Sequence, residues 1–224
     1  MSMFKMMAFG FSALLLLRGA LALEEQKVPL RTELPRPRLG SWPKPILADI
    51  PVEPQLLGRR PDFMIPAGCT NLALGKKVSA SVKRPMHGEL AEITDGLKSC
   101  EEENCVELDA GPQWIQIDLE APREIFALLI WRQASSPRVY HAVVIQVSDD
   151  AKFRKDVQTL YNSDRENVHG LGAGTNLSFI ENYQGQLIDA KGVKGRYVRL
   201  YSNGSTWNKF NHYSEVEVWG RAVK

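Results

Sequence analysis

The stretch "SNGSTWNKFNHYSEVEVWG", residues 202–220, decides the fold. Its first half is a polar loop that holds Trp207, Phe210 and Tyr213, and its second half, "EVEVWG", alternates acidic and apolar residues. A period of two is typical of a β-strand with one face buried and the other in water. We therefore expect a loop rich in aromatic residues that leads directly into the last strand of a β-sheet.

Strand-like segments continue upstream of this stretch. The segments "WIQIDL" (114–119) and "RYVRLY" (196–201) also alternate, whereas "EIFALLIW" (124–131) and "YHAVVIQVS" (140–148) are more continuously apolar, as strands covered on both faces would be. Turn sequences such as "SSPR" and "SNGS" separate them, and no long stretch has a helical period. The pattern predicts an all-β fold for residues 67–224, an antiparallel β-sandwich with a single core.

The first 22 residues have the pattern of a secretory signal peptide. Lys5 precedes an apolar run over residues 6–17, and "ALA" at 20–22 is a small-x-small cleavage site. The apolar run is short for a bilayer, and no second run of about 20 apolar residues follows. We expect a secreted or periplasmic protein without a transmembrane segment.

Residues 23–66 have a proline every few positions. Proline removes a backbone donor and fixes φ, so this segment can be neither a central strand nor a long helix. We expect an extended, partly polyproline linker or arm. Scattered apolar side chains could pack it along the surface of the following domain: Trp42, Ile46, Leu56, Leu57 and Phe63.

The formal net charge of +2 falls to zero when Lys5 and Arg18 leave with the signal peptide. Charge therefore gives no reason to expect nucleic acid or an anionic membrane as a partner. Three cysteines, Cys69, Cys100 and Cys105, would meet oxidising conditions in an exported protein. A Cys100–Cys105 disulfide is favoured, but Cys69 with either partner and three reduced thiols remain open.

Signatures of catalysis are missing from the sequence. There is no G-x-S-x-G, no H-E-x-x-H, no glycine-rich phosphate loop and no cysteine spacing that suits zinc. Aspartates and glutamates are available for a glycosidase pair, but no pair stands out. A non-catalytic protein is expected, and a small hydrolase is the least favoured class.

Within "AEITDGLKSC" (91–100), the dipeptide Asp95-Gly96 has two interpretations. It is either a plain turn or part of a calcium loop, because glycine lets the backbone curl around an ion. Calcium takes six to eight oxygens, so a second carboxylate would have to come from elsewhere in the chain. The dipeptide alone does not decide between the two.

Five motifs occur together in one order: "NLALGKKVSAS" (71–81), "ITDG" (93–96), "WIQIDL", "RYVRLYSNG" (196–204) and "SEVEVWG" (214–220). In this the chain resembles the discoidin, or coagulation factor type C, family of galactose-binding-like domains. That family includes family 32 carbohydrate-binding modules and the F-type lectins, and the sequence of this chain is similar to those of exported bacterial members. The resemblance implies an antiparallel jelly-roll β-sandwich.

The resemblance also implies a structural calcium ion between the Asp-Gly loop and the last strand. The matching groups are the carboxylates of Asp95 and Glu215 and backbone carbonyls near Glu92, Leu97 and Ser214. Glu215 would then hold the end of the chain to a loop more than a hundred residues earlier. By alternation with Val216 and Val218 alone, Glu215 is instead a solvent-facing residue of the strand.

A ligand cup at one end of the sandwich is the second implied feature. Sugars present C–H faces and hydroxyl edges, so their sites need an aromatic platform beside hydrogen-bonding groups. Three loops, 131–141, 162–176 and 203–213, offer such groups: Arg132, Arg138, Tyr140, His141, Trp207, Asn211 and His212. The alternatives are core packing, backbone hydrogen bonds, solvated charges and a Trp207 folded over Phe210. The basic triad of the F-type lectins has no linear match, so fucose specificity is not expected.

The expected function is that of an exported, non-catalytic module that binds a glycan or polysaccharide on a calcium-stabilised β-sandwich. The alternative is a protein-interaction or cell-envelope scaffold module. In that case the same loops, or the proline-rich arm, would bind another exported protein.

Overall fold

The computed structural model describes residues 25–37, 49–56, 58–98, 105–136 and 138–223. The expected signal peptide, the middle of the arm and Cys100 of the expected disulfide lie outside these residues. The described chain forms strands and one short 3-10 helix, η2, and in this part no α-helix occurs and no helix is long and apolar enough to cross a membrane. The elements are β1 (Lys27–Pro29), β2 (Met64–Pro66), β3 (Thr70–Asn71), β4 (Val78–Ala80), η2 (Leu90–Thr94), β5 (Val106–Leu108), β6 (Gln113–Trp131), β7 (Val144–Ser148), β8 (Gln158–Asn162), β9 (Gln186–Ser202), β10 (Asn211–Tyr213) and β11 (Glu215–Ala222).

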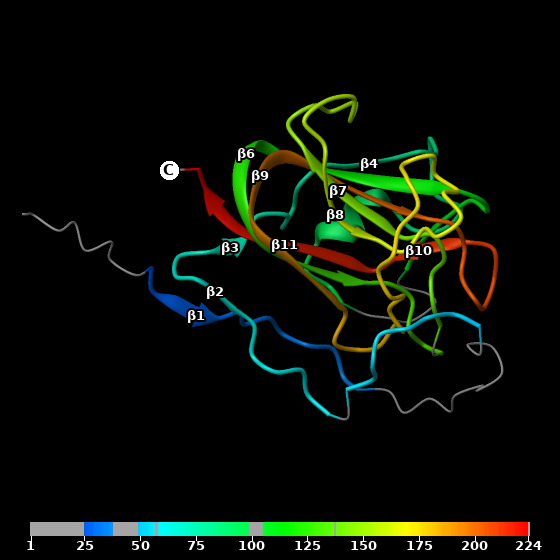
Figure 1. Ribbon diagram of the computed structural model, residues 1–224, viewed down its shortest axis with the longest axis horizontal. Helices are drawn as coiled ribbons and strands as arrows, with labels where there is room; N and C mark the ends of the chain where they lie inside the picture. The colour runs from blue at the N-terminus through cyan, green and yellow to red at the C-terminus, as the bar shows by residue number, and fades with distance from the viewer. Residues whose placement is uncertain (1–24, 38–48, 57, 99–104, 137, 224) are drawn as a thin grey trace, which may run out of the picture.

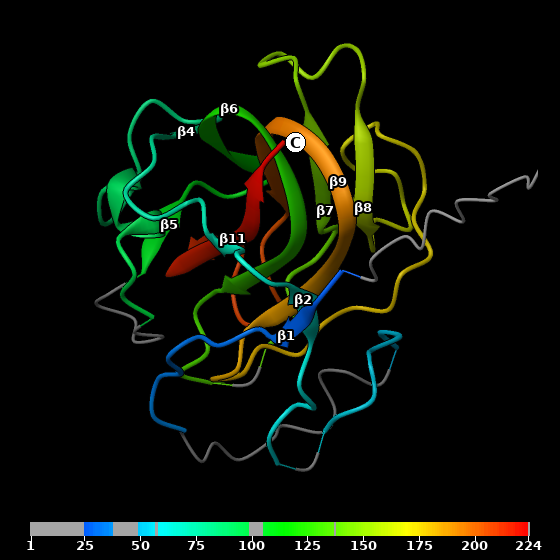
Figure 2. The same ribbon diagram turned by 90° about the vertical axis from the view of Figure 1, so that its left-hand side faces the viewer.

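The long strands β6 and β9 run antiparallel along most of their length. Gln113–Asp118 pairs with Tyr197–Ser202, and Arg123–Ile130 pairs with Gln186–Gly195. The register shifts between Asp118 and Arg123, and again between Ile125 and Ala127. Such irregularities bend a strand, and Figure 2 shows β6 and β9 arching together over the body.

The bend divides one sheet into two halves. The strand order in the described chain is β3-β11-β6-β9-β7-β8, with β4 also on β6. β4 and β7 join the half around 113–118 and 197–202, whereas β11 joins the half around 123–131. A separate antiparallel pair, β5 with β10, lies at the end where the loops gather.

A single hydrophobic core fills the space between the two halves. Its members come from both: Ile115, Ile117, Val198 and Leu200 from the first, and Leu128, Ile130, Val216 and Val218 from the second. All five residues of β7 are buried, as its continuous apolar sequence predicts. The predicted antiparallel β-sandwich is therefore confirmed.

The described parts of the proline-rich arm lie on the outer face of the sheet. β1 and β2 form an antiparallel pair, and Arg31 donates two hydrogen bonds to Asp62, of 3.0 and 3.1 Å. Leu30 packs on a second apolar cluster, built around Leu129 and Trp131 of β6. Figure 1 shows both arm segments, blue and cyan, running along the underside of the body.

If the arm packs in this way, Leu30→Ala will lower the free energy of unfolding by about 1–2 kcal/mol, because it removes a partly buried apolar side chain. Leu56 is 58% exposed in the same arm, so Leu56→Ala is the matched control and will change stability by less than about 0.5 kcal/mol. Denaturant unfolding measures both. Equal stability of Leu30→Ala and the unchanged protein would contradict the packing.

Candidate functional site

The Asp95-Gly96 turn and the first residue of β11 are in contact. The amide of Gly96 donates a hydrogen bond of 3.1 Å to Oε2 of Glu215, across 119 positions of sequence. Oδ1 of Asp95 accepts the amide of Leu97 at 2.8 Å, which closes the turn. Gly96 has φ of +90°, a conformation that suits glycine. The structure thus brings together the two segments that the predicted calcium site requires.

The carboxylate of Glu215 is fully buried. Glu215 is 0% exposed, so the solvent-facing alternative for it is wrong: the Gly96 turn covers the start of β11. Its Oε1 accepts no hydrogen bond from any described residue. Burial raises the pKa of Glu215 to about 8, helped by the charges of Glu217 and Asp95 and opposed by the Gly96 amide and Lys98. A buried acceptor without a partner is costly, so a cation would relieve it.

The residues present fit a hard cation such as calcium. Two carboxylates, Asp95 and Glu215, lie in adjoining segments, and Oε1 of Glu215 accepts no hydrogen bond from the described residues. The described chain holds no group of three or more His, Cys, Asp or Glu side chains that could bind a metal. A cation here would therefore need backbone carbonyls too, for which Glu92, Leu97 and Ser214 of the same two segments are the candidates.

The three loops predicted to form the ligand cup come together at one end of the sandwich. We call these loops, residues 131–141, 162–176 and 203–213, the rim. The first and third are joined by an antiparallel bridge between Tyr140 and Ser205. The amide of His141 also donates to the carbonyl of Gly204 at 3.0 Å. Nε2 of His169, in the second loop, is 2.9 Å from the carbonyl oxygen of Ala142. In Figure 1 these loops surround β10.

Trp207 is the exposed aromatic group of the rim. It is 54% exposed, and the guanidinium carbon of Arg138 lies 5.4 Å from the centroid of its ring. Arg138 is itself 2% exposed, so it supports the indole from within the protein. The exposed part of the indole can therefore meet a ligand while Arg138 supports the ring.

The other predicted contact residues differ in their access to solvent. His141 is partly exposed, and burial lowers the pKa of its imidazole. Asn211 is 0% exposed: its Oδ1 accepts the amide of Gly204 at 2.8 Å, and its Nδ2 donates to the carbonyls of Asp109 and Gly111. This amide holds two loops together, and in this conformation it does not reach the surface.

His212 and Tyr140 belong to the rim loops, but their side chains are buried below the surface. They are 3% and 2% exposed, and their rings meet edge to face with centroids 6.0 Å apart. Nε2 of His212 is 2.9 Å from Oε2 of Glu107 in β5, so the histidine ties β10 to its partner strand by side chain as well as by backbone.

Arg132 forms a buried ion pair with Glu181. Its Nη1 donates to Glu181 Oε1 at 2.9 Å and to Gln186 Oε1 at 3.0 Å, and the two charged side chains are 0% and 1% exposed. The guanidinium also lies 5.5 Å from the ring centroid of Tyr140 and 5.6 Å from that of Tyr213. Burial raises the pKa of Glu181 to about 7, with Arg132 opposing the rise. The pair braces the rim from below.

Sequence reasoning missed Glu181 and Glu217. Glu181 sits in the polar segment "ENYQGQ" (181–186), which offers no periodic signal for a buried charge. Glu217 alternates with Val216 and Val218 as a solvent-facing residue would, yet it is 3% exposed. The arm, through Thr32, and the segment after Asp95, through Lys98, both contact Glu217, and both are distant from it in sequence.

Above about pH 8, where the Glu181 carboxyl is charged, Glu181→Gln will lower the free energy of unfolding by about 3–5 kcal/mol, because it leaves the Arg132 charge buried without its counter-ion. Replacing both partners by apolar residues, Arg132→Met with Glu181→Leu, will cost less than the single change. Denaturant unfolding of Arg132→Met, Glu181→Leu and the double variant gives the coupling energy between the two residues. Strictly additive losses would show that the pair does not act as a unit.

The sequence profile of the F5/8 type C domain family matches residues 78–216, more than half of the chain, and the chain belongs to this family. A search of curated proteins found no match.

The chain is similar to several solved structures, of which the first described here shares the fold at a TM-score above 0.5. A family 89 glycoside hydrolase from Clostridium perfringens, in complex with GlcNAc-α-1,4-galactose, is 16% identical with a TM-score of 0.51; the match covers 68% of this chain and 15% of that one. A fucose-binding module from Streptococcus pneumoniae is 21% identical with a TM-score of 0.48, over 66% and 96%. A chitosan-binding module from a chitosanase/glucanase of Paenibacillus sp. IK-5 is 22% identical with a TM-score of 0.45, over 67% and 99%.

Proposed function

We propose that this protein is an exported, non-catalytic module that binds carbohydrate at its rim. The observation that carries the proposal is Trp207, more than half exposed and held on the buried guanidinium of Arg138. A flat indole that is partly exposed suits the C–H face of a sugar ring. His141, in the adjoining loop, supplies a hydrogen-bonding group for the hydroxyl edge.

The rim is suited to shallow, pre-formed recognition. The Arg132–Glu181 pair, the Asn211 amide and the Tyr140–His212 contact fix its loops from inside. Little ordering is then left for the moment of binding, which limits the entropic cost. A single sugar contacts few groups here, so weak affinity for one ring and a gain from multivalency are expected.

Calcium is the proposed structural cofactor. It would be held by the carboxylates of Asp95 and Glu215 and by carbonyls of Glu92, Leu97 and Ser214. The support is the buried Oε1 of Glu215, which accepts no hydrogen bond from the described residues, and its contact with the Asp-Gly turn. When bound, the ion would join the start of β11 to this turn and so stabilise the body that carries the rim.

The proposal of export is supported by the N-terminal sequence, where a basic residue, an apolar run and "ALA" at 20–22 match the pattern of a signal peptide. The competing proposal, a scaffold module that binds another exported protein through its arm, is less favoured. The described arm segments are already engaged with their own sheet.

Trp207→Ala will weaken carbohydrate binding at least about tenfold, the effect of losing about 1.4 kcal/mol of stacking. Met64→Ala, which truncates a 47% exposed side chain on β2 away from the rim, is the matched control and will bind as the unchanged protein does. A glycan array of neutral, acidic and amino sugars that includes GlcNAc-α-1,4-galactose, followed by titration calorimetry, makes the measurement. No binding across the array would refute the proposal.

Calcium at about a hundred times its Kd will raise the Tm of the unchanged protein by about 5–10 °C, because the ion binds only the folded state. Glu215→Gln will lose this rise while keeping a similar Tm in chelator, since a raised pKa leaves the native group mostly neutral at pH 7. Glu120→Gln, at a side chain 65% exposed, is the control and keeps the rise. Differential scanning calorimetry with and without chelator distinguishes them.

A further inference from the structure

The arm is fastened to the sandwich by specific polar contacts as well as by apolar packing. Contact points in the described residues include Glu25 with Arg221, Thr32 with Glu217, Glu53 with the carbonyl of Ser178, and Arg60 with Gln184 and Gly185. These contacts occur both before and after the part of the arm that the structure does not describe. Its position on the body is therefore defined in register, as a flexible linker would not be.

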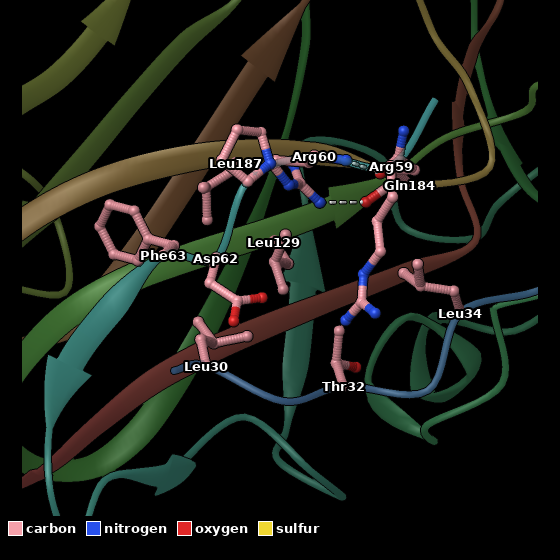
Figure 3. A pocket seen from close by; sticks show the side chains of 11 residues that line it. Leu30, Thr32, Leu34, Arg59, Arg60, Asp62, Phe63, Leu129, Gln184 and Leu187 are labelled. Carbon is pink, nitrogen blue, oxygen red and sulfur yellow. Dashed lines mark hydrogen bonds between the residues drawn. The ribbon is translucent and has the colours of Figure 1, made fainter. Parts of the chain in front are cut away.

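Arg60 makes the most extensive of these contacts. Its guanidinium donates to the carbonyls of Gly185 at 3.0 Å and Gln184 at 2.6 Å, and its amide donates to Oε1 of Gln184 at 2.7 Å. Figure 3 shows Arg60 directed at Gln184, with Leu30 and Leu129 in the hollow between arm and sheet. The hollow is small and lined by both arm segments, so the arm is seated closely.

Thr32 reaches the carboxylate of Glu217. Its Oγ1 donates to Glu217 Oε1 at 2.8 Å, and Nζ of Lys98 lies 2.8 Å from the same oxygen. The other oxygen, Oε2, accepts the indole N–H of Trp219 at 2.8 Å. A single carboxylate, 3% exposed, thus joins the arm, the segment after Asp95 and the last strand.

Lys98 and Glu217 repeat the connection made at the predicted calcium site. Lys98 follows Asp95 by three positions, and Glu217 follows Glu215 by two. The Lys98 side chain is 10% exposed, and its ammonium lies 5.3 Å from the ring centroid of Trp131, which limits where it can go. The same two segments are therefore tied twice, once at Gly96–Glu215 and once at Lys98–Glu217.

We propose that the arm is a positioning element for calcium: Thr32, acting through Glu217 and Lys98, holds the Asp95 turn against Glu215. This inference rests on the calcium part of the proposed function. Arm docking and calcium binding then stabilise the same arrangement, so each strengthens the other by the same factor. Thr32 touches no proposed ligand atom, and its effect is transmitted through Glu217.

The test compares Thr32→Val, which removes the hydroxyl at constant shape, with Thr175→Val, at an exposed threonine of the rim. In the full chain, Thr32→Val will weaken calcium binding about fivefold by titration calorimetry. Calcium will also slow hydrogen exchange of two amides beside β1 and β2. The amide of Leu30 donates to the carbonyl of Phe63, and that of Ala67 to the carbonyl of Gln26, each at 2.8 Å. That slowing will be smaller in Thr32→Val, and Thr175→Val will match the unchanged protein in both measurements.

The outcomes separate the two proposals. If calcium raises the Tm of the unchanged protein but Thr32→Val binds it equally well, the positioning role is overturned and the calcium site stands. If calcium leaves the Tm and the arm exchange of the unchanged protein unaltered, the calcium site and the positioning role fall together. Sugar binding at Trp207 is measured apart from both.

Discussion

The buried carboxylate of Glu215, in contact with the Gly96 amide, is the constraint on which the rest of the structure depends. It stands at the start of β11 and receives a hydrogen bond from a turn near the beginning of the sandwich. The last strand is therefore fixed at the point where it enters the sheet, beside β6. Because β6 and β9 extend from this half of the sheet into the other, a fixed β11 also steadies the strands that lead to the rim.

The rim illustrates how charged groups serve structure below the surface proposed to bind carbohydrate. Arg132 and Glu181 are nearly inaccessible, and the aromatic rings of Tyr140 and Tyr213 enclose the guanidinium. Buried pairs of this kind add little net stability but define a geometry, since any displacement leaves a charge without its partner. Trp207 lies outside this buried group of side chains, on loops whose conformation the group restricts.

Much of the fold could be predicted because strand periodicity is local. The segments 114–119, 196–201 and 215–220 alternate and lie in β6, β9 and β11. Alternation could not predict the burial of Glu215 and Glu217, because it assumes a wet outer face, and the arm and the Asp95 turn that cover them are remote in sequence. The contact of Glu215 with the Asp95 turn was expected only from the family resemblance. The rim loops were predicted from the family resemblance, and their polar and aromatic composition supplied the candidate contact residues. Which of their residues face solvent depends on long-range partners such as Glu107 and Glu181, and composition does not reveal these.

The ends of the described chain lie together, where Glu25 pairs with Arg221. In Figure 1 the C-terminus and β1 are on the side away from β10 and the rim loops. A neighbouring domain, surface or bead joined at either end would thus sit on the side away from the proposed recognition surface and leave Trp207 facing outward. This geometry suits display in repeated copies, where many weak sites act together on one extended target.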